Sequence, residues 1–363
     1  MRAAPPPLEL DRLIDDPRVR IVVTTGAGGV GKTTTAAALA LRAAERGRGT
    51  VVLTIDPARR LAQSMGLNEL DNTPRQVEGI DTSAGGRLDA MMLDMKRTFD
   101  EVVEAHTTPD RARQILSNPF YQALSSSFSG TQEYMAMEKL GQLRRLDEWD
   151  LIVVDTPPSR SALDFLDAPE RLASFLDGRL IRLLTAPART GGRAYLRVLS
   201  AGMSAVTSAF TKILGGELLR DVQTFISALD TMFGGFRERA EETYALLQRP
   251  ETAFVVIAMP EADALREASY FIERLEADGM PLAGVVLNRM HPGGTGALSA
   301  EQAVAGAERL EGTSGHALTA ALLRVHAERM ALAARDSRLA ERFGAAHPQV
   351  PAMRVPALPV DVH

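Results

Sequence analysis

The chain has 363 residues, a length that suits one α/β core carrying a sizeable insertion. Hydrophobic residues make up 45% and charged residues 24%, so the composition excludes general disorder. The formal net charge of -5 argues against nonspecific nucleic-acid binding. The absence of cysteine excludes disulfides, thiolate zinc sites and cysteine nucleophiles.

The N-terminal segment from Met1 to Ile14 has no apolar core of signal-peptide length, and no apolar run is long enough to span a bilayer. We therefore expect a cytoplasmic protein. The segment from Ala3 to Pro7 and the proline-rich end have the composition of surface segments. The sequence leaves open whether the natural chain continues past His363.

A β-branched run from Arg20 to Thr25 predicts the first strand, and a helix-like stretch from Thr34 to Arg46 follows it. Between them the sequence matches the phosphate-loop pattern G-x-x-x-x-G-K-[ST]. The matching residues are Gly26, Ala27, Gly28, Gly29, Val30, Gly31, Lys32 and Thr33. A strand before the motif and a helix after it are the context that this motif requires.

Glycines in such a loop let backbone N–H groups converge on phosphate oxygens, and the positive N-terminus of the helix, which opens at Thr34, lies behind them. Lys32 adds a positive charge beside the β- and γ-phosphates, and the Thr33 hydroxyl is placed to ligate Mg²⁺. The loop therefore predicts ATP and Mg²⁺ as cofactors, in preference to a glycine-rich turn without a ligand.

Two further strands end on an aspartate. Asp56 follows the run from Thr50 to Ile55, and Asp155 follows the run from Leu151 to Val154. Ligands of parallel α/β sheets bind outside the carboxyl ends of the strands, so both can converge on the phosphate loop. Either aspartate alone is more typical of a helix cap, but together with the phosphate loop we predict that Asp56 orients the attacking water and that Asp155 holds Mg²⁺.

The strand–helix alternation stops between about Arg97 and Leu247, apart from the strand at Leu151, and apolar residues recur there at helical spacing. It resumes with strands at Ala253 to Ala258 and Ala283 to Leu287 and a helix at Ala262 to Asp278. We predict a doubly wound, mostly parallel α/β sheet, forming one domain over residues 1–363. A helical subdomain at 97–150 and 160–247 is inserted around the third core strand.

At this point the sequence resembles the ArsA ATPases, which include the arsenite-pump ATPase and the factor that delivers tail-anchored membrane proteins. The likeness covers nearly the whole chain. It runs through GAGGVGKTT, TIDPARRLAQSMG from Thr54, SGTQEYMAMEKL from Ser129, DTPPSRSALDFL from Asp155, MPEADALREA from Met259, VVLNRM from Val285 and RVPALPVDV from Arg354. The resemblance implies a P-loop NTPase fold and an ATPase activity.

The resemblance also implies roles for individual residues. Asp56 matches the family's water-polarising aspartate, and the segment that begins at Asp155 matches the switch that senses the γ-phosphate. Glu261 matches a glutamate that reaches nucleotide at the dimer interface. Asn288 matches the residue that reads adenine, and the stretch from Pro356 matches the loop packed against the base.

One departure from the family concerns Ala27, where members usually carry a second lysine that reaches the partner's nucleotide. Three outcomes follow from the resemblance: a homodimer with slow ATP turnover, another cation such as Arg59, Arg60 or Arg160 in its place, or a heterodimer with a related subunit that keeps the lysine. An alternative function is therefore a nucleotide-binding regulatory subunit with little hydrolysis of its own.

The second departure is the lack of cysteine, which removes the zinc clamp of the targeting factor and the thiols of the arsenite pump. We expect no zinc and disfavour arsenite transport. A methionine-lined groove for a hydrophobic client helix has only scattered candidates here, among them Met135, Met137, Met203 and Met232, and ordinary core packing competes with it. A positioning ATPase of the ParA/MinD type fits less well, because such proteins lack the long helical insert.

Overall fold

The computed structural model describes residues 5–56, 60–67, 69–118, 121–122, 131–157, 238–293, 298–311, 313 and 315–359. The chain divides into two compact units. Unit 1 comprises Met1–Met92, Glu148–Leu163 and Leu247–His363, and unit 2 comprises Leu93–Asp147 and Asp164–Leu246. Most of the predicted helical insert at 160–247 lies outside the described residues, so that part stays a prediction.

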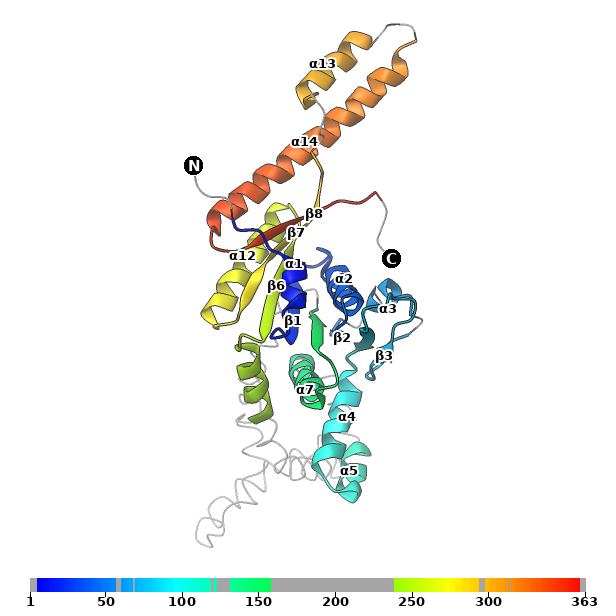
Figure 1. Ribbon diagram of the computed structural model, residues 1–363, viewed down its shortest axis with the longest axis vertical. Coiled ribbons are helices and arrows are strands. Elements are labelled where there is room, and N and C mark those ends of the chain that lie inside the picture. Colours follow the sequence, from blue (N-terminus) through cyan, green and yellow to red (C-terminus); the bar gives the residue numbers. More distant parts are fainter. Residues whose placement is uncertain are drawn as a thin grey trace, which may run out of the picture. The chain divides into compact units, whose positions relative to one another are not determined.

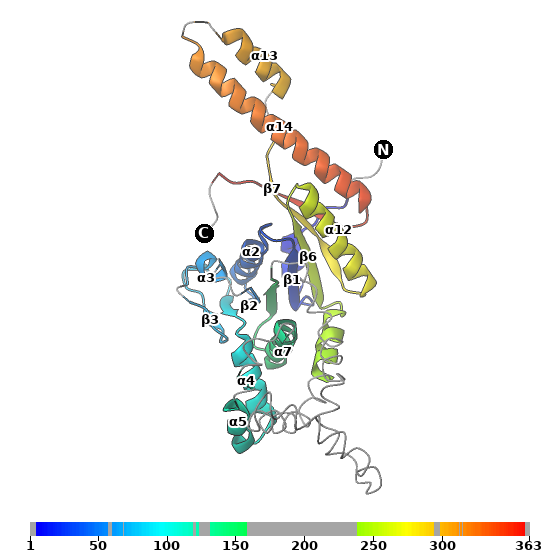
Figure 2. The same cartoon turned by 180° about the vertical axis from the view of Figure 1, so that it is seen from behind.

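Unit 1 is built on an eight-stranded sheet of order β3-β4-β2-β5-β1-β6-β7-β8, which confirms the predicted α/β fold (Figures 1 and 2). β3 runs antiparallel to β4, and all other neighbours are parallel. The strands are β1 Ile21–Gly26, β2 Gly49–Thr54, β3 Arg75–Gln76, β4 Arg87–Met92, β5 Leu151–Asp155, β6 Thr252–Ala258, β7 Leu282–Met290 and β8 Ala352–Pro356.

The strands β1, β5 and β6 form the centre of the sheet and are buried along their whole length. This is why their sequences are continuous apolar runs instead of alternating ones. The predicted third core strand, β5, is the fifth along the chain, because β3 and β4 precede it. The apolar pattern misses β4 because Arg87 and Asp89 interrupt it.

The helices of unit 1 are α1 Leu10–Asp15, α2 Lys32–Glu45, α3 Arg60–Ser64, α12 Ala262–Ala277, α13 Ala300–Leu310 and α14 Ala317–Ala346. The buried face of α2 consists largely of alanine, with Ala36, Ala40 and Ala43 fully buried. Alanine has the highest helix propensity, and its small side chain lets the helix backbone approach the sheet closely. The start of α2 is thereby fixed beside the end of β1.

The N-terminal segment of unit 1 pairs with the start of the edge strand β8. The backbone N–H of Leu8 donates to the carbonyl of Ala352, and the N–H of Ala352 donates to the carbonyl of Pro6. The segments predicted as surface therefore also extend the sheet, and β8 remains partly exposed. Edge position explains why its sequence tolerates arginine and proline.

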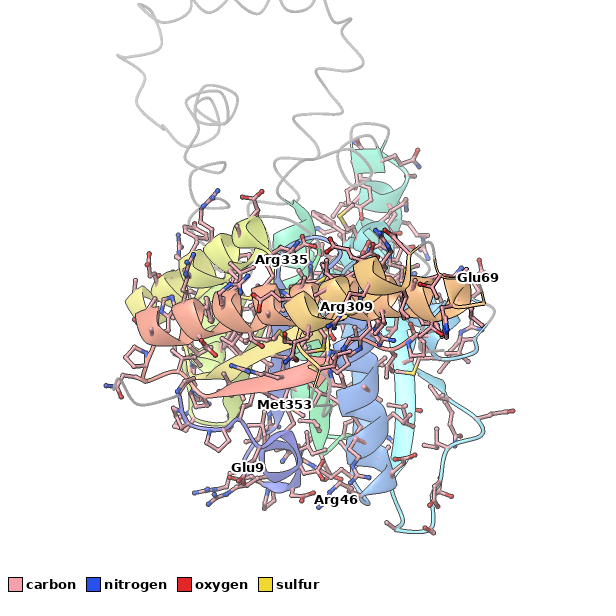
Figure 3. The ribbon with its side chains drawn as sticks, turned by 90° about the horizontal axis from the view of Figure 1, so that it is seen from above. Glu9, Arg46, Glu69, Arg309, Arg335 and Met353 are labelled. Atoms are coloured by element: carbon pink, nitrogen blue, oxygen red, sulfur yellow. The ribbon has the colours of Figure 1, made fainter. Side chains whose placement is uncertain are left out.

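α13 and α14 pack against each other as a helical hairpin, with Arg309 on the first helix and Arg335 on the second (Figure 3). A buried aspartate fastens α14 to the end of β7: Asp336 Oδ2 accepts a hydrogen bond from the backbone N–H of His291 at 3.1 Å and contacts its Nδ1 at 2.7 Å. Among the described residues, no helix is long and apolar enough to cross a membrane.

The described part of unit 2 is helical, with α4 Met95–His106, α5 Pro109–Leu116, α7 Thr131–Leu146 and most of a further helix at 238–247. The α4 N-terminus is capped by Asp94, whose side chain accepts from the N–H of Arg97. Met135 and Met137 are buried. These two methionines are therefore core residues and do not line an open groove, while Met203 and Met232 lie outside the described residues.

A buried ion pair holds the helix at 238–247 to α7. The Glu138 side chain is only 1% exposed and accepts from Nε of Arg239 at 2.9 Å. Arg239→Ala is expected to lower the free energy of unfolding by about 3 kcal/mol, because it takes a charged partner from a buried carboxylate. Urea unfolding measures this loss, with Arg113→Ala in an exposed pair as the control, expected to change stability by less than about 0.5 kcal/mol. Equal midpoints for the two variants would refute the argument.

Candidate nucleotide-binding site

The phosphate loop leaves the sheet at the carboxyl end of β1 and ends where α2 begins. Two of its glycines are required by their surroundings. Gly31 has φ +95°, and a Cβ there would lie 2.4 Å from Nδ2 of Asn288. Gly26 has φ +152°, and a Cβ there would lie 2.1 Å from the carbonyl oxygen of Ile257. The loop is therefore packed against β6 and β7, and a side chain at either position forces it out of place.

Lys32 is the buried cation of the loop. The residue is 5% exposed, and its Nζ donates to the carbonyl oxygens of Gly26 at 2.9 Å and Ala27 at 2.8 Å. Burial lowers the pKa of Lys32, while the negative charges of Asp155 and Asp56 oppose that shift. An ammonium group held by two neutral carbonyls can exchange them for phosphate oxygens, which form stronger charge-assisted hydrogen bonds.

Asp155 lies at the end of β5 and is completely buried. Its Oδ2 accepts from the hydroxyls of Thr33 at 2.8 Å and Thr54 at 2.9 Å. Its Oδ1 is buried and has no hydrogen-bond partner among the described residues. Burial raises the pKa of Asp155 to about 6, partly opposed by the two hydroxyls and by Lys32.

These donors and acceptors fit a hydrated divalent cation. Oxygen ligands are what Mg²⁺ prefers, and a buried carboxylate oxygen without a donor is costly unless a cation or its water satisfies it. Thr33 and Asp155, the two residues expected at the metal, are in contact through their side chains. Among the described residues there is no group of three or more His, Asp or Glu side chains that could hold a metal ion by themselves.

Asp56 lies two residues beyond the last residue of β2, with its side chain 10% exposed. Its backbone N–H donates to Oγ1 of Thr54 at 3.2 Å. The same Thr54 hydroxyl donates to Asp155, so one side chain positions both aspartates. Thr54 was not predicted from the sequence, because a buried threonine near a strand end has no distinctive signal of its own.

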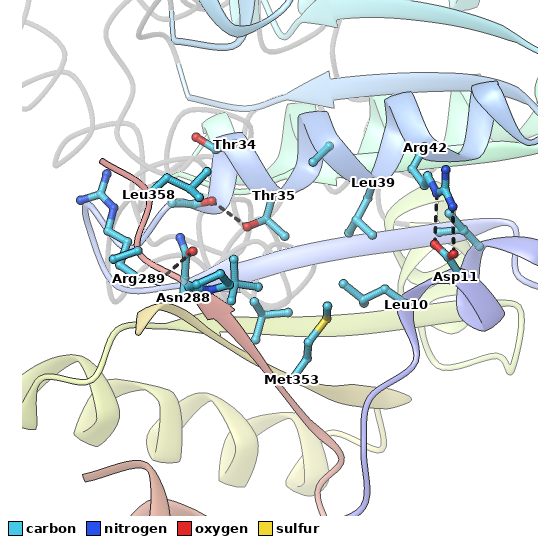
Figure 4. Close-up of a pocket in the computed structure, with 17 residues that line it drawn as sticks. Leu10, Asp11, Thr34, Thr35, Leu39, Arg42, Asn288, Arg289, Met353 and Leu358 are labelled. Carbon is cyan, nitrogen blue, oxygen red and sulfur yellow. Dashed lines mark hydrogen bonds and ion pairs between the residues drawn. The ribbon is translucent and has the colours of Figure 1, made fainter. Parts of the chain in front are cut away.

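A cavity of about 770 Å³ lies beside the phosphate loop (Figure 4). Gly31, Thr34 and Thr35 line it from the loop and α2, and Asn288 lines it from β7. The end of β8 and the two residues after it also line the cavity, through residues 355–358. Its volume is typical of small-molecule pockets and its lining is mainly apolar, as suits an adenine base and a ribose.

Asn288 is held at both ends of its amide. Nδ2 donates to the carbonyl of Val30 at 2.9 Å, and Oδ1 accepts from the N–H of Arg289. Arg289 has φ +55°, a sparsely populated conformation for a residue other than glycine, which turns the chain at the end of β7. The cavity wall is thus bonded directly to the phosphate loop.

The structure brings most of the predicted site residues together. Asp155 and Asp56 lie beside Lys32 and Thr33 of the loop. Thr34, Asn288 and Pro356 line the adjoining cavity. Glu261 is the exposed residue before α12 and does not line the cavity. Glu261 was predicted to reach nucleotide across a dimer interface, and a single chain does not test that prediction. The lining by Leu10, Asp11 and Arg42 was not predicted from the sequence.

Comparison with known proteins agrees with this geometry. The anion-transporting ATPase family, ArsA, matches residues 19–301. The chain is similar to ATPase GET3 of Malassezia globosa, with 25% identity over 290 residues that cover 79% of this chain and 77% of that protein. It is similar to ATPase ASNA1 homolog 2 of Paramecium tetraurelia, with 23% identity over 286 residues, 77% of this chain and 79% of that protein.

A third relative, ATPase GET3 of Ajellomyces dermatitidis, is 26% identical over 285 residues, which cover 77% of this chain and 76% of that protein. The matched region contains the phosphate loop, both aspartates and Asn288. The resemblance drawn from the sequence is thus confirmed. The chain belongs to the ArsA family of anion-transporting ATPases.

Proposed function

We propose that the chain binds ATP with Mg²⁺ at the phosphate loop and hydrolyses it. The observation that carries this proposal is the network in which the Asp155 carboxylate accepts from the hydroxyls of Thr33 and Thr54 beside the buried Lys32. A P-loop threonine bonded to the aspartate that ends a core strand is the arrangement that the metal-bound triphosphate requires.

In this proposal each residue has one task. Lys32 leaves the loop carbonyls and binds the β- and γ-phosphates. Thr33 and Asp155 are the residues that would hold Mg²⁺, which when bound neutralises charge on the phosphates. Asp56 orients the attacking water and accepts its proton. Asn288, Thr34 and the turn after Pro356 hold the base and ribose in the cavity.

Glu261 has a different place in this proposal, because it lies outside the cavity. We propose that ATP binding and release open and close a dimer, with Glu261 facing the nucleotide across the subunit contact. The dimer consists of two copies of this chain or of this chain and a related subunit. Ala27 is uncharged and only 8% exposed, so this chain cannot supply the lysine that family members extend from this position to the partner's nucleotide. Ala27 therefore supports pairing with a related subunit that keeps the lysine.

The competing proposal is a regulatory subunit that binds nucleotide and turns it over little. Phosphate release by the purified chain with ATP and Mg²⁺, recorded with its oligomeric mass in the same buffer, separates the two. Turnover that EDTA abolishes supports the ATPase. Retained nucleotide binding without turnover supports the regulatory subunit and directs the search to a lysine-bearing partner.

The proposed client is a hydrophobic or membrane-protein helix, held by the helical insert. It rests on the family resemblance and on the apolar residues at helical spacing between Tyr195 and Phe236. That stretch lies outside the described residues. Crosslinking of the chain to a peptide with one apolar transmembrane segment, against a scrambled peptide with added charges, tests it.

The buried Asp155 predicts how stability depends on pH in the nucleotide-free protein. Its pKa is about 6 when folded and 3.8 when unfolded, so the folded state holds the extra proton between these values. Unfolding therefore releases a proton there, and stability falls as pH rises from about 4 to 6. We expect the stability of the parent relative to Asp155→Asn to fall by about 3 kcal/mol over this range.

Urea unfolding of both proteins at a series of pH values from 4 to 7.5 measures that difference. Since every other titrating group is shared by the two proteins, the difference isolates Asp155. A difference that stays constant across the series would show that Asp155 is ionised in the folded protein throughout.

A further inference from the structure

We propose that Arg60 is a nucleotide-sensing residue, which pairs with Asp56 in the nucleotide-free protein and moves to the terminal phosphate when ATP binds. The inference rests on the proposed function and goes beyond it, because it assigns the terminal-phosphate contact to a side chain outside the phosphate loop. It also gives the protein a means to tell ATP from ADP.

The position of Arg60 places its charge at the site. It is the first residue of α3, four residues after Asp56. Its Nη1 lies 4.0 Å from Oδ2 of Asp56, within ion-pair range but beyond hydrogen-bond length. The charge of Arg60 also lowers the pKa of the buried Lys32, a smaller effect than burial or the nearby aspartates. The charges of Arg60 and Asp56 therefore both act on Lys32, and Arg60 lies close to the phosphate loop.

The two side chains of this ion pair differ in their exposure to solvent and therefore in how far each can move. The Asp56 side chain is 10% exposed and its backbone N–H is bonded to Thr54, so this residue has little room to move. The Arg60 side chain is 60% exposed, so it is able to swing. The contact is longer than a hydrogen bond and its arginine is exposed to solvent, so releasing Arg60 costs little.

A bound triphosphate offers the guanidinium a better partner. Phosphate oxygens match the planar fork of arginine donors and allow two parallel hydrogen bonds, whereas the contact with Asp56 is too long for one. ADP lacks the terminal phosphate and cannot draw Arg60 as far.

Equilibrium titration with the slowly hydrolysed analogue ATPγS and with ADP, both with Mg²⁺, tests this. Arg60→Ala is expected to weaken ATPγS binding roughly tenfold and to change ADP binding by less than about twofold. Arg60→Lys keeps the charge without the fork and is expected to lose roughly threefold for ATPγS. Arg309→Ala, an exposed arginine on α13, is the matched control and should change neither affinity.

Two results would overturn the inference while the proposed function stands: an unchanged ATPγS affinity in Arg60→Ala, or equal weakening of ATPγS and ADP. Binding of neither nucleotide by the parent would instead remove the proposed function and this inference together. ADP binding by Arg60→Lys shows whether the variant is folded, because the lysine keeps the positive charge. Loss of ADP binding in this variant as well would overturn the assignment.

Discussion

Asp56→Asn is expected to lower ATP turnover by roughly 10² to 10⁴ while the affinity for ATP stays within about twofold of the parent. Asp56 lies two residues beyond β2, with its backbone N–H bonded to Thr54 and its side chain 10% exposed. Asparagine has the same shape and preserves the packing. It cannot accept the proton of the attacking water, so the loss falls on the chemical step.

The matched control for this variant is Asp71→Asn, because Asp71 is an exposed aspartate paired with Arg75. Steady-state phosphate release and equilibrium nucleotide titration are measured on both variants. Turnover at the parent's rate in Asp56→Asn would show that another group orients the water. A loss of ATP affinity as large as the loss of turnover would show that Asp56 binds nucleotide instead.

Lys32→Ala has the second large expected effect, a loss of ATP affinity of roughly 100-fold, because charge-assisted hydrogen bonds to phosphate contribute about 3 kcal/mol. Folding should be little affected. The ammonium group is buried in the nucleotide-free protein and is held there by two loop carbonyls, at a desolvation cost that lowers its pKa. Removing it therefore removes an unfavourable contribution along with two hydrogen bonds.

Lys96→Ala is the control for Lys32→Ala, because Lys96 forms a surface ion pair with Asp100 in unit 2. Both variants are titrated with ATP and with ADP, and their thermal midpoints are compared with the parent. Undiminished ATP binding by Lys32→Ala at an unchanged midpoint would place the nucleotide away from the phosphate loop.

The central strands and the phosphate loop were predictable because each depends on local pattern. β1, β5 and β6 are buried on both faces, so their sequences are uninterrupted apolar runs. The loop follows β1 directly, as its motif requires. The edge strand β8 escaped prediction because it is half exposed and contains Arg354 and Pro356, which no buried strand would carry.

The rest of the site depends on contacts between distant segments. The Thr54 hydroxyl donates to Asp155 on the neighbouring strand, 101 positions later in the sequence. No local sequence pattern around Thr54 predicts that hydrogen bond. Asn288 entered the prediction only through the family resemblance, because its hydrogen bond to Val30 joins residues 258 positions apart. The α13–α14 hairpin was missed because its packing faces are mostly alanine, which gives a weak apolar period.

The measurement that tests the central claim most directly is a calorimetric titration of the purified chain with ATP, in Mg²⁺ and again in EDTA. We predict saturable binding of one ATP per chain in Mg²⁺ and clearly weaker binding in EDTA, since Thr33 and Asp155 then have no cation to hold beside the phosphates. No heat of binding in either buffer, from folded protein, would contradict the assignment of this site to nucleotide.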